Sequence, residues 1–372
     1  MTGQCFPAFL LISALAVSPA TPTYSQAAAS RMPVPLFWTS QAGTDLPAKP
    51  AWIVQKSGTE ASLRGISVVD GSTAWASGSQ GTVLRTIDGG QSWVTKAIPG
   101  MGRTDFRDIE AFDAGTAVVM GIGRPAKIFR TEDGGENWAE VYSSDTPGIF
   151  LDALAFADKR AGWAVGDPID GRFVLLRTED GGRTWQERSS DRRPAAREGE
   201  GCFAASGTCL VAQGLNGALF CTGGRAARLI RTSDGGATWT SAALPLLGGQ
   251  PSFGAFGIAF LDGKNGLAVG GDYRNEQGAR GNAAITSDGG ASWTAVEARP
   301  PSGFRECAAF VSRTESALAV TVGPSGSDYS LDGGRTWAPI PGLGGWHGLS
   351  VSPDGRCAWA VCKGGLIALL RF

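Results

Sequence analysis

The sequence is poor in histidine, in charged residues and in long apolar runs, and each shortage excludes a class of protein. Its 372 residues include one histidine, His347, and 18% charged residues, with a net charge of −1. One histidine cannot supply a multi-histidine metal site. A chain so close to neutral lacks the basic surface of a nucleic-acid-binding protein. After the N-terminal segment no apolar run reaches the roughly 18 residues that a membrane-spanning helix needs.

The motifs of several enzyme classes are missing as well. No glycine-rich dinucleotide fingerprint lies between a strand and a helix, and no G-x-S-x-G motif lies in a strand–turn–helix setting. The cysteines show no Cys-x-x-Cys spacing of a zinc or redox site. We therefore expect no cofactor and no metal.

The first residues predict an exported protein. Residues 6–17 form an apolar stretch too short to span a bilayer, and residues 25–27 provide a small-residue cleavage site, with Ala20 as a second candidate. We interpret residues 1–27 as a signal peptide, 28–50 as a linker and 51–372 as one domain. A soluble, monomeric, periplasmic or secreted protein follows.

Six cysteines follow the predicted signal, and an even number in an exported protein permits disulfides. They are Cys202, Cys209, Cys221, Cys307, Cys357 and Cys362. Their pairing stays open: Cys202 and Cys209 are close enough in sequence to close a short loop. Buried free thiols are the other interpretation, particularly for Cys357 and Cys362.

What the sequence has in abundance is one short pattern, [ST]-x-D-G-G-x-[STN]-W, which occurs six times. Spacings of 44 to 54 residues between its aspartates indicate an array of structural repeats. The aspartate and tryptophan positions are Asp88 and Trp93, Asp133 and Trp138, Asp180 and Trp185, Asp234 and Trp239, Asp288 and Trp293, and Asp332 and Trp337.

Each copy, called a box below, predicts the turn of a β-hairpin. The aspartate can accept hydrogen bonds from backbone N–H groups, and the two glycines tolerate positive φ angles. The tryptophan begins the next strand and can bury a large apolar surface. The pattern is that of the Asp box, or bacterial neuraminidase repeat. We interpret the six aspartates as structural, because a catalytic or metal-binding aspartate would stand alone on its own repeat.

Between the boxes the same order of strands recurs, so the sequence predicts an all-β propeller. Inner strands are expected at residues 63–69, 106–112, 150–156, 200–206, 255–260, 305–310 and 346–351. The seventh repeat ends without a box or a fourth strand, while an extra strand at residues 51–58 precedes the first repeat. We predict a seven-bladed β-propeller whose last blade is closed by the N-terminal strand, which removes an open sheet edge.

The repeats, their number and the F-R-D-I run at residues 106–109 resemble the photosystem II stability and assembly factor family, which has relatives in non-photosynthetic bacteria. The resemblance covers about residues 50–372. It implies a non-catalytic lumenal or periplasmic scaffold that helps to assemble a membrane complex through an arginine-rich surface. A protein partner is expected, such as a membrane-complex subunit.

We expect this partner to bind the face opposite the boxes, where long loops and inner-strand starts collect charged residues. The candidate residues are Arg64, Arg107, Asp108, Asp152, Arg192, Arg193, Arg197, Arg305 and His347.

The alternative is a carbohydrate-active propeller, either a sialidase-like or other glycoside hydrolase or a sugar-binding protein. Such a hydrolase needs two carboxylates at short range. Asp108 and Asp152 begin adjacent inner strands and would have to provide them. Otherwise they pair with Arg107 and Arg64 and hold the channel mouth together.

Overall fold

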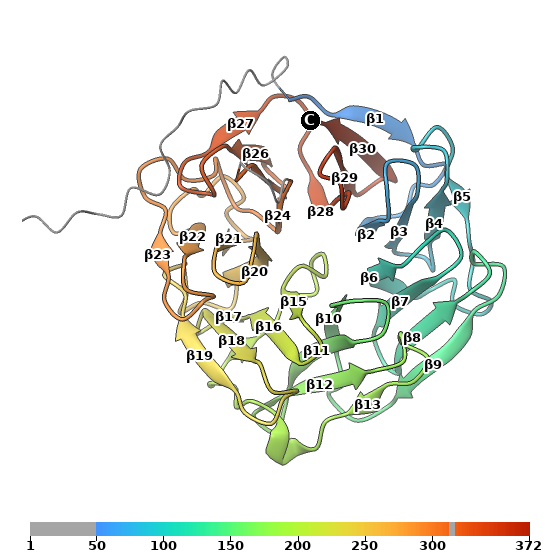
Figure 1. Cartoon of the computed structure of the whole chain (residues 1–372), viewed down its shortest axis with the longest axis horizontal. Coiled ribbons are helices and arrows are strands. Elements are labelled where there is room, and N and C mark those ends of the chain that lie inside the picture. The colour runs from blue at the N-terminus through green and yellow to red at the C-terminus, as the bar shows by residue number, and fades with distance from the viewer. Residues whose placement is uncertain (1–49, 312–316) are drawn as a thin grey trace, which may run out of the picture. The chain divides into compact units, whose positions relative to one another are not determined.

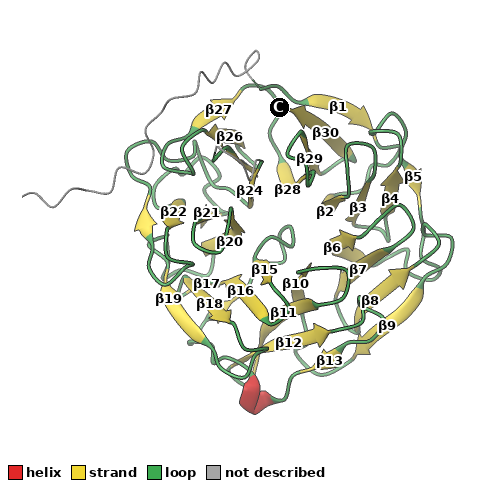
Figure 2. Ribbon diagram, viewed as in Figure 1, coloured by secondary structure: helices red, strands yellow, loops and turns green. Residues whose placement is uncertain are grey.

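The computed structural model of the protein describes residues 50–311 and 317–372. In them the repeats form seven antiparallel sheets, the blades, set in a ring whose inner strands face a common centre (Figures 1 and 2). The predicted seven-bladed propeller is therefore confirmed. The predicted signal peptide, and all of the predicted linker except residue 50, lie outside the described residues.

Blades one to three follow the chain order without interruption. Blade one is β2 (Leu63–Val68), β3 (Ala74–Gly78), β4 (Val83–Thr86) and β5 (Val94–Thr95). Blade two is β6 (Asp105–Ala111), β7 (Ala117–Ile122), β8 (Ala126–Thr131) and β9 (Ala139–Ser144). Blade three is β10 (Leu151–Phe156), β11 (Gly162–Ile169), β12 (Arg172–Thr178) and β13 (Gln186–Glu187).

Blades four to six include the longer connections. Blade four is β15 (Leu210–Gln213), β16 (Gly217–Cys221), β18 (Arg228–Thr232) and β19 (Thr240–Ala243). Blade five is β20 (Phe253–Phe260), β21 (Gly266–Asp272), β22 (Ala283–Thr286) and β23 (Thr294–Ala295), extended at its inner side by β17 (Gly223–Gly224) and β14 (Glu200–Gly201). Blade six is β24 (Cys307–Phe310), β25 (Ala319–Gly323), β26 (Gly326–Ser330) and β27 (Ala338–Ile340).

Blade seven contains both ends of the propeller. It consists of β28 (Trp346–Val351), β29 (Cys357–Cys362), β30 (Leu366–Arg371) and the N-terminal strand β1 (Ile53–Lys56). The described part of the chain has one helical turn, η1 (Ser190–Arg192), and no helix long and apolar enough to cross a membrane.

The N-terminal strand closes the ring as predicted. β1 pairs with β30 from Ile53 opposite Leu369 to Lys56 opposite Leu366. Between these pairs, the Gln55 side chain joins blade seven to blade one. Its Oε1 accepts hydrogen bonds from Trp359 of β29 at 3.0 Å and from Trp93 of the first box at 3.2 Å.

The core lies between neighbouring blades, and large aromatic side chains fill it. Trp75 of β3 is fully buried and meets the box residue Trp138 of the next blade edge to face, with ring centroids 6.2 Å apart. Trp163 of β11 meets Trp239 in the same way at 6.1 Å. The tryptophan of a box therefore stabilises the contact with the preceding blade.

All six boxes form the same hydrogen-bonded turn. In the first, Asp88 Oδ1 accepts from Thr86 Oγ1 at 2.8 Å and from the backbone N–H of Ser92 at 2.9 Å, and Oδ2 accepts from Ser92 Oγ at 2.6 Å. The Gly89 N–H donates to Ser72 O in the turn between the first two strands. The hydrogen bonds from Ser92 hold the pKa of Asp88 at about 2. The boxes and first turns thus share one face, the box face.

The predicted inner strand at residues 200–206 is wrong, because blade four takes β15 as its inner strand instead. Residues 203–208 leave the sheet and form a loop, here called the plug. Thr208 O accepts from the Ile258 N–H at 2.9 Å, and Ala204 O accepts from Arg107 Nη1 at 2.8 Å. The plug therefore contacts blades two and five across the ring, where Figure 1 shows a loop reaching the centre beside β15.

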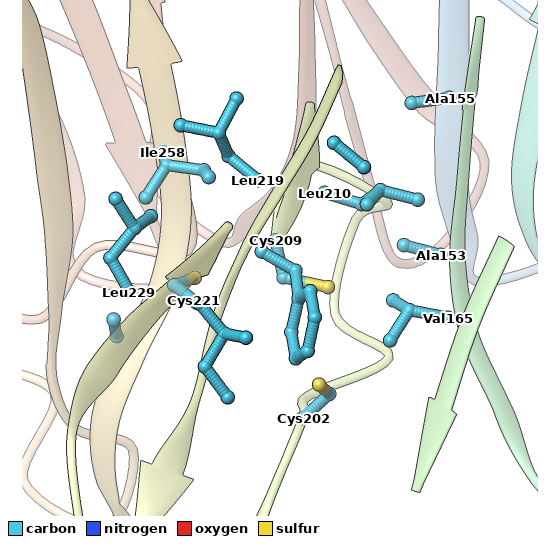
Figure 3. Close-up of a cluster of buried hydrophobic side chains, with 14 of the residues drawn as sticks. Ala153, Ala155, Val165, Cys202, Cys209, Leu210, Leu219, Cys221, Leu229 and Ile258 are labelled. Carbon is cyan, nitrogen blue, oxygen red and sulfur yellow. The ribbon is translucent and has the colours of Figure 1, made fainter. Parts of the chain in front are cut away.

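The six cysteines are buried free thiols, so of the two interpretations left open by the sequence the structure supports the second, and Cys202 and Cys209 are not bridged. Cys202, Cys209 and Cys221 are members of one hydrophobic cluster with Phe173 and Phe220 (Figure 3). Burial raises the pKa of the Cys221 thiol above its ordinary value. These side chains act as small apolar residues in the core.

The closure predicts that Gln55→Ala destabilises the propeller by about 2 kcal/mol or more, because two buried indole N–H groups lose their acceptor. Thermal and urea unfolding followed by circular dichroism measures the loss. Gln91→Ala is the matched control, since Gln91 is exposed and donates only to Asp88 O in the same seam. Equal midpoints for the two variants would contradict the assigned role.

The box geometry predicts that Asp180→Ala lowers the free energy of unfolding by roughly 1–2 kcal/mol, because the turn loses its shared acceptor. Partner binding should be unchanged. Glu179→Ala, at the exposed neighbouring position, is the control. A variant that unfolds like the wild type but no longer binds a partner would show that this box is functional rather than structural.

The contact between the plug and Asp108 predicts that Gly207→Ala lowers the free energy of unfolding more than Gly214→Ala does. Both glycines have positive φ, +81° and +61°, but a Cβ at Gly207 would lie 2.2 Å from Asp108 Oδ1, whereas Gly214 faces open space. The difference isolates the steric contact and should be roughly 1–3 kcal/mol in denaturant unfolding. Equal losses would mean that the plug does not press against Asp108.

Candidate functional site

One residue from each of several inner strands points into the centre of the ring because the strand bulges there. The pairing register shifts by one residue at Arg64, Arg107, Asp152, Phe256 and His347, always near the strand's start. A bulge turns the extra residue out of the ladder and re-aims its side chain. All five side chains line a single cavity of about 550 Å³, called the mouth cavity below.

In blade six the equivalent residue is Glu306, not Arg305. Cys307 pairs with Val322, next to the last glycine of β25, just as Asp108 pairs with Met120 next to the last glycine of β7. The residue before Cys307 therefore occupies the place that Arg107 has in blade two. Glu306 does line the mouth cavity.

Arg305 lies one position earlier and is fully buried, which corrects the prediction that it lines the partner-binding face. Its guanidinium donates to Asp328 Oδ2 at 2.7 Å through Nε and to Ser302 Oγ at 2.8 Å through Nη2. The ion pair with Asp328 is itself buried, at 0% and 1% side-chain exposure. Arg305 thus anchors the interior of blade six.

The mouth cavity lies toward the face opposite the boxes, called the mouth face. Residues from the loops between blades and from the hairpins between second and third strands complete its lining. They include Phe150, Asp167, Phe203, Tyr273, Pro324 and Lys363.

Basic residues come from blades seven, one and two. Arg64 Nη1 lies 3.1 Å from His347 Nδ1, which lies 3.1 Å from Glu306 Oε2. Arg107 pairs with Asp105 at 2.8 Å. The expected pairing of these arginines with Asp108 and Asp152 is therefore not formed. His347 lines the channel and is hydrogen-bonded.

Two aspartates come from blade three, in addition to Glu276 and Glu306 elsewhere in the lining. Asp152 is 1% exposed, and its oxygens make no hydrogen bond of ordinary geometry, although the Ala204 and Asp167 backbone N–H groups lie near enough to favour its charged form. Burial and the neighbouring Asp167 raise the pKa of Asp152 well above its ordinary value. Asp167 accepts from the Cys202 N–H at 3.1 Å, and burial raises its pKa too.

Aromatic residues of blades five and six and of the plug form a wall beside these acids. Phe203 stacks on Phe256 with ring centroids 3.9 Å apart and planes at 5°. Tyr273 meets both rings edge to face, and Phe304 meets Phe256 in the same way. Tyr273 is 42% exposed, so the wall reaches the surface.

A second cavity of about 350 Å³ lies on the box side of the plug, with both polar and apolar residues in its lining. It contains Asp108, which accepts backbone hydrogen bonds from Ile109 and Leu154, and Glu110, whose pKa burial raises to about 7. Asp108 and Asp152 thus line different cavities, and the carboxylate pair that a hydrolase needs is absent at these positions. In the described residues no three histidine, cysteine or acidic side chains are placed to hold a metal ion.

The other predicted arginines lie away from the mouth cavity. They belong to the segment around η1, which Figure 2 shows at the outer rim of the ring beside β13. Arg192 and Arg197 are exposed, whereas Arg193 donates to Arg188 O and pairs with Glu187. The predicted arginine surface therefore consists of two separate parts, the mouth and the rim.

Sequence reasoning missed the plug, the aromatic wall and Glu306, and it did not single out Asp167 as a site residue. The aromatic residues offered a weak signal, since Phe203 and Tyr273 both lie in segments that lengthen the repeat. The position of Glu306 follows only from strand pairing, which the sequence motif F-R-E-C does not reveal.

The comparisons with known proteins agree with this architecture. The family model described as photosynthesis system II assembly factor YCF48 matches residues 45–149 and 143–370. The photosystem II stability/assembly factor HCF136, chloroplastic, of Arabidopsis thaliana is 35% identical over 88 residues. That match spans 23% of this chain and 21% of the plant protein, so the chain aligns with about a fifth of its relative's length.

Solved structures show the same fold. One described as YCF48 bound to D1 peptide has a TM-score of 0.62 at 16% identity, covering 87% of this chain and 99% of that one. YCF48 from Cyanidioschyzon merolae gives 0.61 at 18% identity, covering 86% and 98%. The Neurospora crassa Pan2 WD40 domain gives 0.56 at 12% identity, covering 84% and 89%. Because the family model covers nearly the whole propeller, this chain belongs to the YCF48 family of photosystem II assembly factors.

Proposed function

We propose that this protein is an exported, non-catalytic scaffold that binds an extramembrane segment of a membrane-complex subunit in its mouth cavity. The observation that carries the proposal is the set of six inner-strand residues, each from a different blade, that line one cavity. A related propeller described as bound to D1 peptide supports a peptide segment as the ligand.

The lining of the cavity suits a peptide. Arginine and aromatic side chains are enriched at the centres of protein interfaces, where they give most of the binding energy. Arg64 and Lys363 offer cations to acidic side chains, while Phe203 and Tyr273 offer apolar surface. The inner strands hold Arg64 and the other bulge residues in place, so less order has to be gained on binding.

Export and location remain part of the proposal. The predicted signal at residues 1–27 and the family membership support a periplasmic site, or a lumenal site if the organism is photosynthetic. A membrane-complex subunit would present its extramembrane segments in the same compartment. Assembly of the complex would then be assisted by holding such a segment until its final partners arrive.

The proposal predicts that charge reversal at the mouth slows association with the partner by about three- to tenfold and makes the rate less sensitive to salt. The mouth variant is Arg64→Glu with Lys363→Glu, and the rim variant is Arg192→Glu with Arg197→Glu. The box-face control is Arg183→Glu with Arg335→Glu, at exposed positions of two boxes. Biolayer interferometry at about 50 and about 300 mM salt measures the rates against a partner recovered by cross-linking in the native envelope.

We expect the mouth variant to be slowest and the box-face variant to match the wild type. The rim variant reports whether the η1 segment takes part in docking. Equal slowing by the mouth and box-face variants would refute a specific binding face. Thermal unfolding of each variant verifies that the propeller remains folded.

A further inference from the structure

Two acidic side chains of the mouth cavity have no cation to balance them. In the described residues neither Asp152 nor Asp167 has an ion-pair partner, and both oxygens of Asp152 lack a hydrogen bond of ordinary geometry. Asp152 is almost fully buried, while Asp167 is half-buried and reaches the cavity. A buried carboxylate without a partner is costly, so such a pair favours either a shared proton or a bound cation.

The nearby arginines form no ion pair with either acid and instead contact other groups. Arg107 binds Asp105 and the carbonyl of Ala204, both at 2.8 Å. Arg64 interacts with His347 and, at 3.9 Å, with Glu306. Arg107 does act on Asp152 through space, but it is itself neutralised by Asp105. This side of the cavity therefore remains negative.

Aromatic rings line the cavity together with the two acids. The Asp167 carboxylate accepts from the N–H of Cys202, and the next residue, Phe203, begins the plug. Phe203 stacks on Phe256, and Tyr273 closes the stack at the surface. Carboxylates beside aromatic rings recognise organic ammonium ions, because the rings attract the cation and contact its methylene groups while the carboxylates accept its N–H bonds.

We propose that Asp167 and Asp152, with Phe203, Phe256 and Tyr273, form a binding site for an alkylammonium group. The group enters from the mouth face, donates to Asp167 and places its methylene groups on Phe203 and Tyr273. Asp152 lies behind Asp167 and adds negative charge. The alkylammonium can belong to a free primary amine or to a lysine side chain, and the site does not depend on the proposed function.

The test measures binding of two probes to the full chain by isothermal titration calorimetry and ligand-observed NMR. Butylammonium chloride represents the free amine, and 1-butanol is its neutral control. The capped tripeptide acetyl-Gly-Lys-Gly-amide represents a lysine side chain, and its Nε-acetylated form is the neutral control. The variants are Asp167→Asn and Asp152→Asn. Asp170→Asn is the matched control, since Asp170 is exposed in the turn after β11 and its positive φ suits asparagine.

We expect Asp167→Asn to weaken ammonium binding by about tenfold, as loss of a charge-assisted hydrogen bond does. Asp152→Asn should weaken it less, because Asp152 does not touch the ammonium, and Asp170→Asn should leave it unchanged. Binding of butylammonium alone would assign the site to a small amine, and binding of the tripeptide as well would assign it to a lysine side chain. If neither cation binds more tightly than its neutral control, or if Asp167→Asn binds like the wild type, the site is refuted. Because Asp152→Asn alters a buried residue, the unfolding midpoint of this variant is measured as well. If it does not fold, the test rests on Asp167→Asn alone.

Discussion

The pairing of β1 with β30 is the contact on which the rest of this structure depends. Without β1, blade seven would lack its outer strand and leave β30 as an open sheet edge where the ring has to close. Here β1 completes the last blade, and Gln55 links that blade to the first box. The mouth cavity takes its lining from blades on both sides of this seam, so it exists only in the closed ring.

Closure alone would give a nearly symmetric channel, and the inner-strand bulges give that channel its chemistry. Each bulge turns one side chain toward the centre without changing the ladder beyond it. The residue at that position varies among the blades from arginine to aspartate, phenylalanine, glutamate or histidine, because its side chain faces the central cavity rather than the sheet ladder. A propeller family can therefore keep its blades and change its ligand by substitutions at these few positions.

Local patterns in the sequence predicted the fold, whereas long-range pairing determined the site. The boxes act over eight residues, so their turns, spacing and strand order could be recognised directly. The seventh repeat lacks a fourth strand, and residues 51–58 form an extra strand before the first repeat. Together these two observations predicted that the N-terminal strand completes blade seven. The place of Glu306 depends on which residue of β25 pairs with Cys307. If this pairing shifted by one residue, the buried Arg305 would take the channel position instead of Glu306.

The plug is a second feature that depends on long-range contacts and could not be predicted from the local sequence. It also makes the site asymmetric. Residues 200–206 have the small and apolar residues of an inner strand, but they do not pair with β16. Glu200 and Gly201 pair with β17, Cys202 donates to Asp167, and Ala204 accepts from Arg107. The plug fills the centre on the side of blade four and divides the channel into two cavities. It also adds Phe203 to the acidic side of the mouth, opposite the basic residues of blades seven, one and two. A ligand entering this mouth therefore meets a cationic side and an aromatic, acidic side, which together define its orientation.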